Sequence, residues 1–597
     1  MTLILLQNKK YNSLHEAVVH GSYSSVCSFI DAKTDVNQRD DNGNTPLLLA
    51  VCVQQEETYN KIVAILIENG ADVNATNKGL TPLYNAVFYK RLESIKLLLA
   101  AGAWLNTDPS KYELHILAQQ GEKEILNLFL KDPKCTPDMI NFADLKGRTA
   151  VYFAAENCHK STLKMLIKHG GVLNTECEDG TVIETIFEEV SSPVVFLKEL
   201  LDSNISMQKI MMYGKETKNK KNYIIDFSIL APRPSARQMT VISNLLASAS
   251  DEEKTEVLQH PLIDLFLSLK WAKIRFIFYW LIVIHFVFAT SISSYVFLFV
   301  HDVKNDFPKL RIIAIFSQFL TSMLLLGYGV LQCVLVKGNH FRRFEMWMSI
   351  INSVLSLVVA GLAITKLDNV NIKDCPNWVL HVTSVAVLLA WIQLMLLIGR
   401  LPTFGYYALM FAAVLQNVIK VLLTFLCLII GFALAFSIQF HDFVQFGNPW
   451  HAIIKTTVMM TGEFEYTDLF HSTDNNHRLT GPTQVMFLSF IILTSVVLMN
   501  LMVGLAVSDI QGLQQESLAR KLEKQAEFLD QLEELVYIKS ANSKFVPQCV
   551  NNVFLKRLVI PLNFTIEATA SFQKRNNLSK RLIDSIVCIA KKRKTEA

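Results

Sequence analysis

Long apolar stretches alternate with polar segments in the second half of the chain. A helix needs about 20 apolar residues to cross the core of a bilayer. Stretches of about that length lie at 276–300, 312–336, 346–365, 378–399, 418–438 and 485–507. Each alone is also compatible with a buried helix of a soluble protein, but six in one half of a chain favour a membrane protein. The pattern therefore predicts six transmembrane helices.

A shorter apolar segment, Pro449–Met460, lies between the fifth and sixth predicted spans. Its pattern is helical, but it is too short to cross a membrane. Thr461, Gly462 and Glu463 follow it directly. Irregular backbone survives at membrane depth only where it lines a water-filled cavity or is buried in protein. The segment therefore predicts a re-entrant pore helix, followed by a selectivity filter made of these three residues.

The first half of the chain carries an internal repeat of about 33 residues. Asn44–Ala50 recurs as Leu80–Ala86 and more weakly as Arg148–Ala154, and degenerate copies start at Ser13 and Glu113. Thr-Pro opens a helix in the clearest copies, because Pro is tolerated in the first turn. One such repeat cannot bury its own apolar face, so the repeats must stack. The pattern resembles ankyrin repeats and predicts five to six of them.

The two halves together predict an all-α protein, in which an ankyrin-repeat solenoid precedes a six-helix channel domain with a re-entrant pore helix. The predicted boundaries are 1–205 for the repeat array, 206–270 for a coupling linker, 271–400 for a four-helix, sensor-like transmembrane domain, 401–508 for the pore domain, 509–540 for a post-pore helix or coiled coil, and 541–597 for a basic C-terminal region.

Composition agrees with a membrane protein that has a sizeable soluble part. Hydrophobic residues make up 51% of the chain and charged residues 18%, against about 25% charged in an average soluble protein. The formal net charge of +4 is too small to indicate a nucleic-acid partner. No two of the ten cysteines form a Cys-x-x-Cys pair, so the sequence indicates neither a zinc site nor a disulfide framework. A P-loop and an Asp-His-His-Cys segment are also absent, so neither an enzyme nor a bound cofactor is expected.

Basic residues near the predicted spans indicate their orientation. Lys270, Lys273 and Arg275 precede the first span, Arg343 follows the second, and Arg400 follows the fourth. An even number of spans then puts both ends of the chain in the cytosol, where ankyrin arrays belong, and the plasma membrane is the expected location. The fourth span contains no Arg or Lys before Arg400, although a voltage sensor needs several. Strong voltage gating is therefore not expected.

Two stretches resemble the transient receptor potential channels, specifically the ankyrin (TRPA) subfamily and its short insect-type members. Val497–Ile510 is similar to the sixth span of the family and its exit, and Met459–Glu463 is similar to the filter Met-Met-Leu-Gly-Asp. The resemblance implies a subunit of a tetrameric, non-selective, calcium-permeable cation channel, gated by a sensory stimulus such as heat or chemicals. Relatives sense electrophiles through linker cysteines, but no Cys lies between Cys177 and Cys333 here.

The resemblance also implies which molecules the chain meets. These are other copies of the chain or a related subunit, membrane lipids, permeating cations and proteins bound to the ankyrin array, with phosphoinositide or calcium as candidate regulators and no metal site beyond permeating cations at Glu463. The alternative function is a membrane scaffold in which the array binds partners and the spans only anchor. That alternative leaves Pro449–Met460 and the filter unexplained.

Three acidic residues are candidates for cation selection. Glu463 would occur once per subunit in a ring of four, and rings of Asp or Glu select cations. Glu465 and Asp468 would add negative charge at the outer mouth. The alternative is that Glu463 is an ordinary acid in a loop.

Asn500, Val503 and Val507 share one face of the sixth predicted span. The resemblance puts the two valines at the lower gate, where an apolar ring closes a pore by dewetting. The alternative is that they face lipid or the fifth span. Asn500 either lines the pore or bonds a neighbouring helix.

The segment after the pore contains an apolar stripe that alternates by four and three residues: Leu518, Leu522, Gln525, Leu529, Leu532 and Val536. The stripe predicts a short coiled coil whose register Gln525 would fix, and the alternative is an amphipathic helix that lies along the membrane. Farther on, the basic run 591–594 either binds anionic lipid head groups or is simply solvated. Inside the first four spans, His285, Gln318, Asn352 and Gln393 are either functional or bond helix to helix.

Overall fold

The computed structural model describes most of the chain in two units. The described residues are 11–52, 56–106, 108–208, 211–212, 215–216, 222–231, 237–300, 308–335, 344–365, 377–399, 401, 405–440, 443, 445–464, 481–541, 559–567 and 579–596. One unit comprises residues 1–274 and 526–597, and the other comprises residues 275–525.

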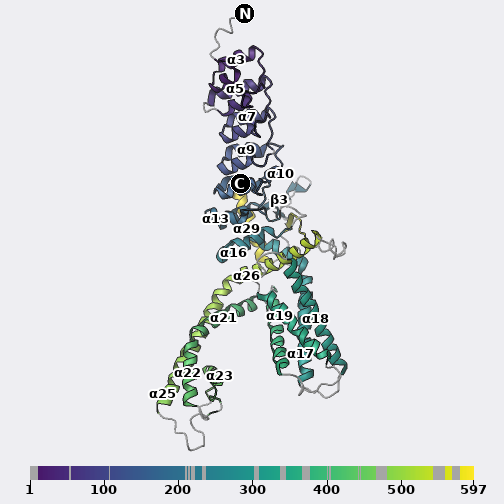
Figure 1. Ribbon diagram of the computed structural model, residues 1–597, viewed down its shortest axis with the longest axis vertical. Helices are drawn as coiled ribbons and strands as arrows, with labels where there is room; N and C mark the ends of the chain where they lie inside the picture. Colours follow the sequence, from purple (N-terminus) through teal and green to yellow (C-terminus); the bar gives the residue numbers. More distant parts are fainter. Residues whose placement is uncertain are drawn as a thin grey trace, which may run out of the picture. The chain divides into compact units, whose positions relative to one another are not determined.

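The N-terminal array is built of helices that follow one another in pairs along the chain. The pairs are α2 Leu14–Val19 with α3 Tyr23–Asp31, α4 Pro46–Cys52 with α5 Glu56–Glu68, α6 Pro82–Phe88 with α7 Leu92–Ala100, α8 Glu113–Gln120 with α9 Lys123–Lys131, α11 Ala150–Glu156 with α12 Lys160–Lys168, and α13 Val182–Glu189 with α14 Pro193–Ser203. The first helix of each pair contacts the first helix of the next pair. Figure 1 shows the second helices α3, α5, α7 and α9 following one another along the array. The short helix α10, Pro137–Ile140, lies between α9 and α11.

The Thr-Pro motif starts the first helix of a pair as expected. Thr81 is extended and its hydroxyl accepts a hydrogen bond from the Tyr84 amide at 3.0 Å, while Pro82 occupies the first turn. This satisfies one of the amides that a helix start leaves without an intrahelical partner. Gly121 ends α8 with a φ of 73°, a left-handed conformation that favours glycine. Each short helix therefore has a defined start or end.

Asparagine side chains join the hairpins of successive repeats. Asn37 donates to the Gly70 carbonyl at 3.0 Å and accepts from the Asp72 amide at 2.7 Å. Asn141 makes the same pair of bonds to Gly170 and Val172, at 2.8 and 2.9 Å. Because each asparagine uses both ends of its amide on the next repeat, these bonds fix the spacing of the repeats.

A three-stranded antiparallel sheet follows the array, in the order β3, β6, β7. Its strands are β3 Ile205–Gln208, β6 Asn222–Asp226 and β7 Asn563–Glu567. Four two-residue strands form two small hairpins, β1 Glu176–Cys177 with β2 Gly180–Thr181, and β4 Met211–Met212 with β5 Lys215–Glu216. The sequence analysis predicted only a coupling linker over residues 206–270 and did not predict the sheet. The sheet needs β7 from the far end of the chain, which no local pattern indicates.

The linker also contains α15, Thr240–Ser248, and α16, Asp251–Leu258. The C-terminal helix α29, Lys580–Glu596, packs on β3. Its Arg593 guanidinium donates to the backbone carbonyls of Asp202, Ser203 and Ile205, near the end of α14. A cation at the carbonyl end of a helix is favourable, so Arg593 ties the C-terminal helix to the array.

The unit 275–525 contains apolar helices at all six predicted spans. The helices are α17 Pro261–Val300, α18 Pro308–Leu335, α19 Phe344–Thr365, α20 Asn377–Ile398, α21 Gly405–Thr424, α22 Leu426–Gln439, α25 Gly481–Phe490, the π-helix η3 Ile491–Leu498, and α26 Met499–Ala541. Over the described residues, four spans are long and apolar enough to cross a membrane, and α21 with α22, bent by 54°, adds a fifth if they form one span. The third predicted span contains the shorter apolar helix Met346–Leu362.

Helices α17 to α20 share an apolar core and a set of buried polar contacts. Gln318 of α18 donates to the Ser356 hydroxyl of α19 at 3.1 Å. Gln393 of α20 lies 3.3 Å from a ring nitrogen of His285 on α17 and 3.5 Å from the amide of Asn352 on α19. All four predicted polar residues therefore take part in contacts between helices, which favours helix bonding as their role.

The asparagine bonds between hairpins generate a stability prediction. Asn37→Ala removes both bonds and should lower the free energy of opening of the 70–76 hairpin by about 1–2 kcal/mol. Hydrogen exchange of the purified full chain would measure this. Asn69→Ala is the matched control, because its amide bonds only the Ile65 carbonyl of its own helix. Equal effects of the two variants would contradict the role of Asn37.

Candidate functional site

The helix α23 runs over Pro449–Met460, the bounds predicted for a pore helix, with Asn448 before it and Pro449 in the first turn. One face of the helix is buried and carries Ala452, Thr456 and Met459. The other face is apolar but uncovered, with Trp450 76% and Ile454 61% exposed. Twelve residues span about 18 Å at 1.5 Å per residue, which is roughly half of a bilayer core.

Phenylalanine side chains hold the buried face of α23 against its neighbours. Phe436 of α22 has its ring 5.1 Å from that of Phe490 and 6.1 Å from that of Phe487, both on α25. These rings join one core cluster with Ala452 and Met459 of α23. Aromatic pairs in such edge or tilted arrangements add to the stabilisation from burial alone. The cluster therefore fixes α23 on both the helix before it and the helix after it.

Two hydrogen bonds brace the ends of this cluster. The Ser437 hydroxyl of α22 donates to the Phe446 carbonyl at 2.9 Å, so the loop before α23 is tied back to α22. The Thr483 hydroxyl of α25 donates to the Gln439 side chain at 3.1 Å. Both bonds lie near the C-terminal end of α22, just before the loop that leads to α23, and they limit movement of that end.

The chain turns sharply where α23 ends. The amides of Thr461 and Gly462 donate to the carbonyls of Val458 and Met459, each at 3.0 Å. Gly462 has a φ of 107°, a conformation that side chains other than glycine rarely adopt. Glycine is therefore needed here for the chain to leave the helix axis at once. Thr461, Gly462 and Glu463 are exposed in the single chain.

One of the three acidic residues predicted to select cations lies among the described residues. The carboxyl group of Glu463 follows the turn directly and is exposed. Glu465 and Asp468 lie outside the described residues. In the described part of the chain, no group of three His, Cys, Asp or Glu side chains is placed to hold a metal ion.

The sixth span contains an irregularity that the sequence analysis missed. Residues Ile491–Leu498 form the π-helix η3, and the Thr494 hydroxyl donates to the Phe490 carbonyl at 2.6 Å. Such wide turns are rare and often mark functional positions. Beyond η3, Val503 and Val507 are 57% and 51% exposed, and Asn500 is exposed too. The wide turns set which face of α26 carries these three side chains.

The helix α26 continues for 43 residues from Met499 to Ala541. Of the predicted coiled-coil stripe, Leu522, Gln525 and Leu529 are buried. Leu532 is half-buried, and the side chains of Leu518 and Val536 lie outside the described residues. Leu529 belongs to the unit that carries the ankyrin array, as do the neighbouring Phe528 and Glu533. This part of the helix is therefore covered inside a single chain.

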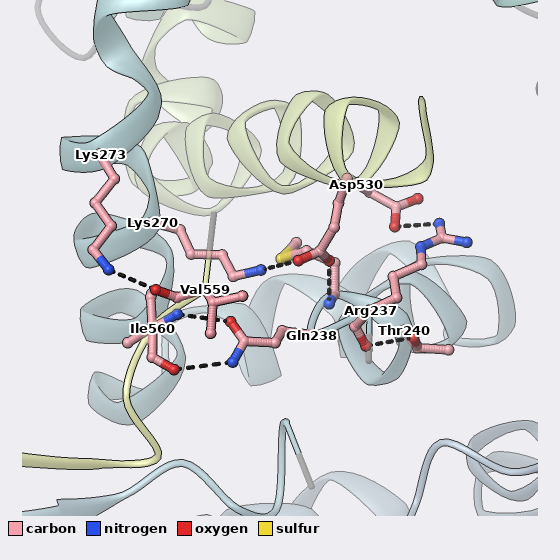
Figure 2. Close-up of polar contacts among 10 residues, drawn as sticks. Arg237, Gln238, Thr240, Lys270, Lys273, Asp530, Val559 and Ile560 are labelled. Atoms are coloured by element: carbon pink, nitrogen blue, oxygen red, sulfur yellow. Dashed lines mark hydrogen bonds and ion pairs between the residues drawn. The ribbon is translucent and has the colours of Figure 1, made fainter. Parts of the chain in front are cut away.

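One buried ion pair joins α26 to the start of α17. The Lys270 ammonium lies 2.5 Å from a carboxylate oxygen of Glu533, and both side chains are completely buried. The second oxygen of Glu533 accepts the Met239 amide at 2.7 Å. Figure 2 shows Lys270 pointing from its helix toward the helix that carries Asp530. A charge pair that is removed from water is stable only when its groups are paired and hydrogen-bonded, as these are.

Further polar contacts surround this pair (Figure 2). Arg237 lies 2.6 Å from Asp530. Burial alone would lower the pKa of Arg237, but Asp530 and Glu534 outweigh that effect and raise the pKa, so the guanidinium stays charged. On the other side, the Gln238 amide makes two 3.0 Å bonds to the backbone of Ile560, and Lys273 donates to Val559 at 2.6 Å. We call the set Arg237, Gln238, Met239, Lys270, Lys273, Asp530, Glu533, Val559 and Ile560 the junction.

The sequence analysis missed the junction, although one signal was present. Lys270 interrupts an apolar run just before the first span, and Glu533 lies one helical turn after Leu529, beside the apolar stripe. Opposite charges on two otherwise apolar faces are expected to pair when those faces meet. Nothing in the sequence, however, shows that these two faces meet.

Comparison with known proteins adds to this geometry. The family described as ion transport protein matches residues 275–518, and ankyrin repeats in three copies match residues 14–109. The chain is 32% identical to the transient receptor potential channel pyrexia of Drosophila melanogaster, over 69% of this chain and 43% of that protein. It is 25% identical to a transient receptor potential subfamily A member 1 homolog of Caenorhabditis elegans, over 90% of this chain and 50% of that protein.

In its ion transport region and its ankyrin repeats, the chain is similar to channels of the ankyrin (TRPA) type of the transient receptor potential family. The protein painless of Drosophila melanogaster, also a transient receptor potential channel, is 27% identical over 62% of this chain and 41% of that protein. The predicted resemblance and the all-α class with ankyrin repeats are therefore confirmed. The relatives are channels, not enzymes. The chain spans about half the length of these relatives.

The buried pair generates a stability prediction for this chain. Lys270→Met or Glu533→Gln alone should lower the free energy of unfolding by about 3–5 kcal/mol, because each leaves an unpaired buried group. The double variant should recover most of this loss, since the neutral side-chain amide in Glu533→Gln can still accept a hydrogen bond from the Met239 backbone. Melting of the purified protein would measure these effects.

The control is Lys198→Met, which breaks an exposed pair with Glu256 at the similar distance of 2.6 Å. An exposed pair contributes only about 0–1 kcal/mol. If the double variant lost as much stability as the two single variants added together, the side chains would not be acting as a pair.

Proposed function

We propose that this chain is one subunit of a tetrameric, non-selective, calcium-permeable cation channel of the plasma membrane, with both ends in the cytosol. A sensory stimulus such as heat or chemicals opens it. Thr461, Gly462 and Glu463 form the filter, and Val503 and Val507 form the lower gate. Glu465 and Asp468 add charge at the outer mouth, and Asn500 either lines the pore or bonds a neighbouring helix.

The observation that carries this proposal is the helix α23, which has the length of half a membrane and ends at a glycine turn with an acidic residue. The turn at Gly462 directs the backbone away from the helix axis. Backbone groups outside a helix must meet water or protein at membrane depth, so this segment suits the wall of an aqueous pore. The aromatic cluster around Phe436 holds it there.

The uncovered apolar face of α23 supports assembly with other subunits. Trp450 and Ile454 lie on this face and are largely exposed in the single chain. Exposed apolar patches of this kind mark interaction surfaces. Four copies around an axis would cover this face and bring four Glu463 side chains to one level. The same requirement is met by a homotetramer and by a mixed tetramer with a related subunit.

The junction supports a route by which the ankyrin array acts on the gate. The helices α17 and α26 each continue from one unit of the chain into the other. Lys270 and Glu533 join these two helices inside the first unit. A load or a ligand on the array would then act on α26, the helix that also carries Val503 and Val507. Ankyrin-bound proteins, phosphoinositide at the exposed Lys591 and Lys592, and calcium are proposed regulators.

A coiled coil between subunits, with Gln525 fixing its register, is part of the proposal. Leu522, Gln525 and Leu529 are all buried in the single chain, so pairing with another subunit would require this part of α26 to leave its contacts within the chain.

The function is tested by recording currents from cells that express the chain, during temperature ramps and application of irritants. Cation currents that are absent from untransfected cells would support the channel. Surface expression without any current under every stimulus would favour the membrane scaffold instead.

The filter generates the first functional prediction. Glu463→Gln removes one negative charge per subunit and should lower the calcium-to-sodium permeability ratio about tenfold, because a ring of charge concentrates cations by at least that factor. Reversal potentials in a calcium gradient measure the ratio. Glu463→Asp is the control and should keep most of the selectivity. Unchanged reversal potentials in Glu463→Gln would exclude this residue from the filter.

The gate generates the second functional prediction. Val507→Asn introduces a polar group that water can wet, so the closed pore should leak. Resting current should rise at least about tenfold, since that factor requires only about 1.4 kcal/mol. The control is Leu505→Asn, which lies on the opposite side of the same helix. Zero resting current in Val507→Asn, or an equal leak in both variants, would show that Val507 does not seal the pore.

A further inference from the structure

Among the described side chains of the ankyrin array, one carboxyl group is completely buried. Glu113, the first residue of α8, has 0% of its surface exposed. It stands where the first helices of two other repeats have Pro46 and Pro82. The substitution of an acid for an apolar ring puts a titratable group into the core between two repeats.

Both carboxyl oxygens of Glu113 accept hydrogen bonds from the preceding repeat. We call this contact between the repeat that begins with α6 and the repeat that begins with α8 the joint. One accepts the hydroxyl of Thr81, the residue before α6, at 3.2 Å. The other accepts the backbone amide of Asn106 at 2.9 Å. Asn106 in turn donates from its side chain to the Gly79 carbonyl at 2.8 Å. The carboxyl group is therefore the centre of a small set of bonds that closes the joint between the α6 and α8 repeats.

No cation compensates the charge of Glu113. Among the described residues, no Lys, Arg or His forms an ion pair with it. In the adjoining hairpin, Asp108 and Lys111 pair with each other at 4.0 Å. On α8 itself, His115 binds the Phe142 carbonyl at 2.8 Å and faces the next repeat. A buried, unpaired carboxylate is unfavourable, because water stabilises the charge far better than two hydrogen bonds do.

The remaining titratable neighbours do not offset this charge either. Burial raises the pKa of Tyr84 on α6 and of Tyr112 just before α8, so both phenols stay neutral near pH 7. Burial also lowers the pKa of His115, which favours the neutral ring. Over the described residues, no charged side chain of α9 or α11, the other helices packed on α8, acts on the Glu113 carboxyl.

We propose that Glu113 is a proton-binding site of the ankyrin array, and that uptake of one proton tightens the joint between the α6 and α8 repeats. In the neutral form, the carboxyl group still accepts the Asn106 amide and donates its own proton to the Thr81 oxygen. The bonds that close the joint are kept, and the cost of burying a charge is removed. This site does not depend on ion conduction by the chain.

The pH range follows from the burial. Desolvation raises the pKa of Glu113 from 4.5 to about 7, against the opposing effect of its hydrogen bonds from Asn106 and Thr81. A group whose pKa is raised in the folded state stabilises that state fully below the unfolded pKa and loses this effect as pH rises through the folded pKa. Between pH 6 and pH 8, the opening equilibrium of the joint should therefore rise about tenfold.

Hydrogen exchange of the full-length protein in lipid nanodiscs tests the proposal. Peptides that cover residues 81–120 are followed at pH 6, 7 and 8, after correction for the chemical exchange rate. In the natural chain, opening should increase about tenfold from pH 6 to pH 8. In Glu113→Gln, which resembles the neutral form, this dependence should disappear. Glu124→Gln is the matched control, because Glu124 is exposed on α9 of the same repeat, and it should keep the natural pH dependence.

A second variant covers the case in which Glu113→Gln fails to fold. Glu113→Pro restores the residue that two other repeats have at this position, and Tyr112 before it already has the extended backbone that proline requires. It should also show no pH dependence. A natural chain without pH dependence, or a dependence that persists when Glu113 is replaced, would overturn the proposal.

Discussion

The buried pair between Lys270 and Glu533 is the interaction on which the organisation of this chain depends. Two helices, α17 and α26, each continue from the ankyrin-bearing unit into the unit of apolar helices. The pair lies where these helices meet inside the first unit; the Met239 amide donates to Glu533, and the neighbouring Gln238 binds the backbone of Ile560. Because both charges are removed from water, separating them is costly. Movements of the array and of α26 are therefore expected to be coupled.

A second constraint, the need to satisfy backbone groups, shapes the segment around α23. The backbone of α23 forms helical hydrogen bonds, but the chain turns away from the helix axis directly after Met460. Gly462 makes this possible, because its φ of 107° is accessible only at a high cost to other residues. The phenylalanine cluster around Phe436 then holds the helix end in place. The residues that pack on α23 form one apolar core, whereas η3 departs from the regular α-helical hydrogen-bond pattern.

Sequence patterns predicted the features that depend on neighbouring residues. The repeats follow from the Thr-Pro motif, the apolar helices follow from length and composition, and the bounds of α23 follow from Pro449 and Gly462. The features that were missed depend on distant parts of the chain. The sheet pairs β6 with β7, and the junction pairs Lys270 with Glu533. In both cases the sequence around one partner does not indicate which distant residues it will contact.

Two further features were missed for different reasons. The wide turns of η3 are a backbone property of an apolar stretch, Ile491–Leu498, whose composition does not distinguish it from an ordinary helix. The burial of Glu113 was open to prediction, since an acid stands at a position that two other repeats fill with proline. The coiled-coil prediction treated Leu529 as free for another subunit, whereas the same chain covers it.

The most direct test of the channel account is single-channel recording from the purified chain in planar lipid bilayers. The account predicts unitary currents whose reversal potential follows the cation gradient, and a shift toward anion selectivity when Glu463 is replaced by lysine. Unitary currents with the same selectivity in Glu463→Lys would contradict the assigned filter. A folded protein that inserts into the bilayer and gives no current at any temperature tested would contradict the channel itself.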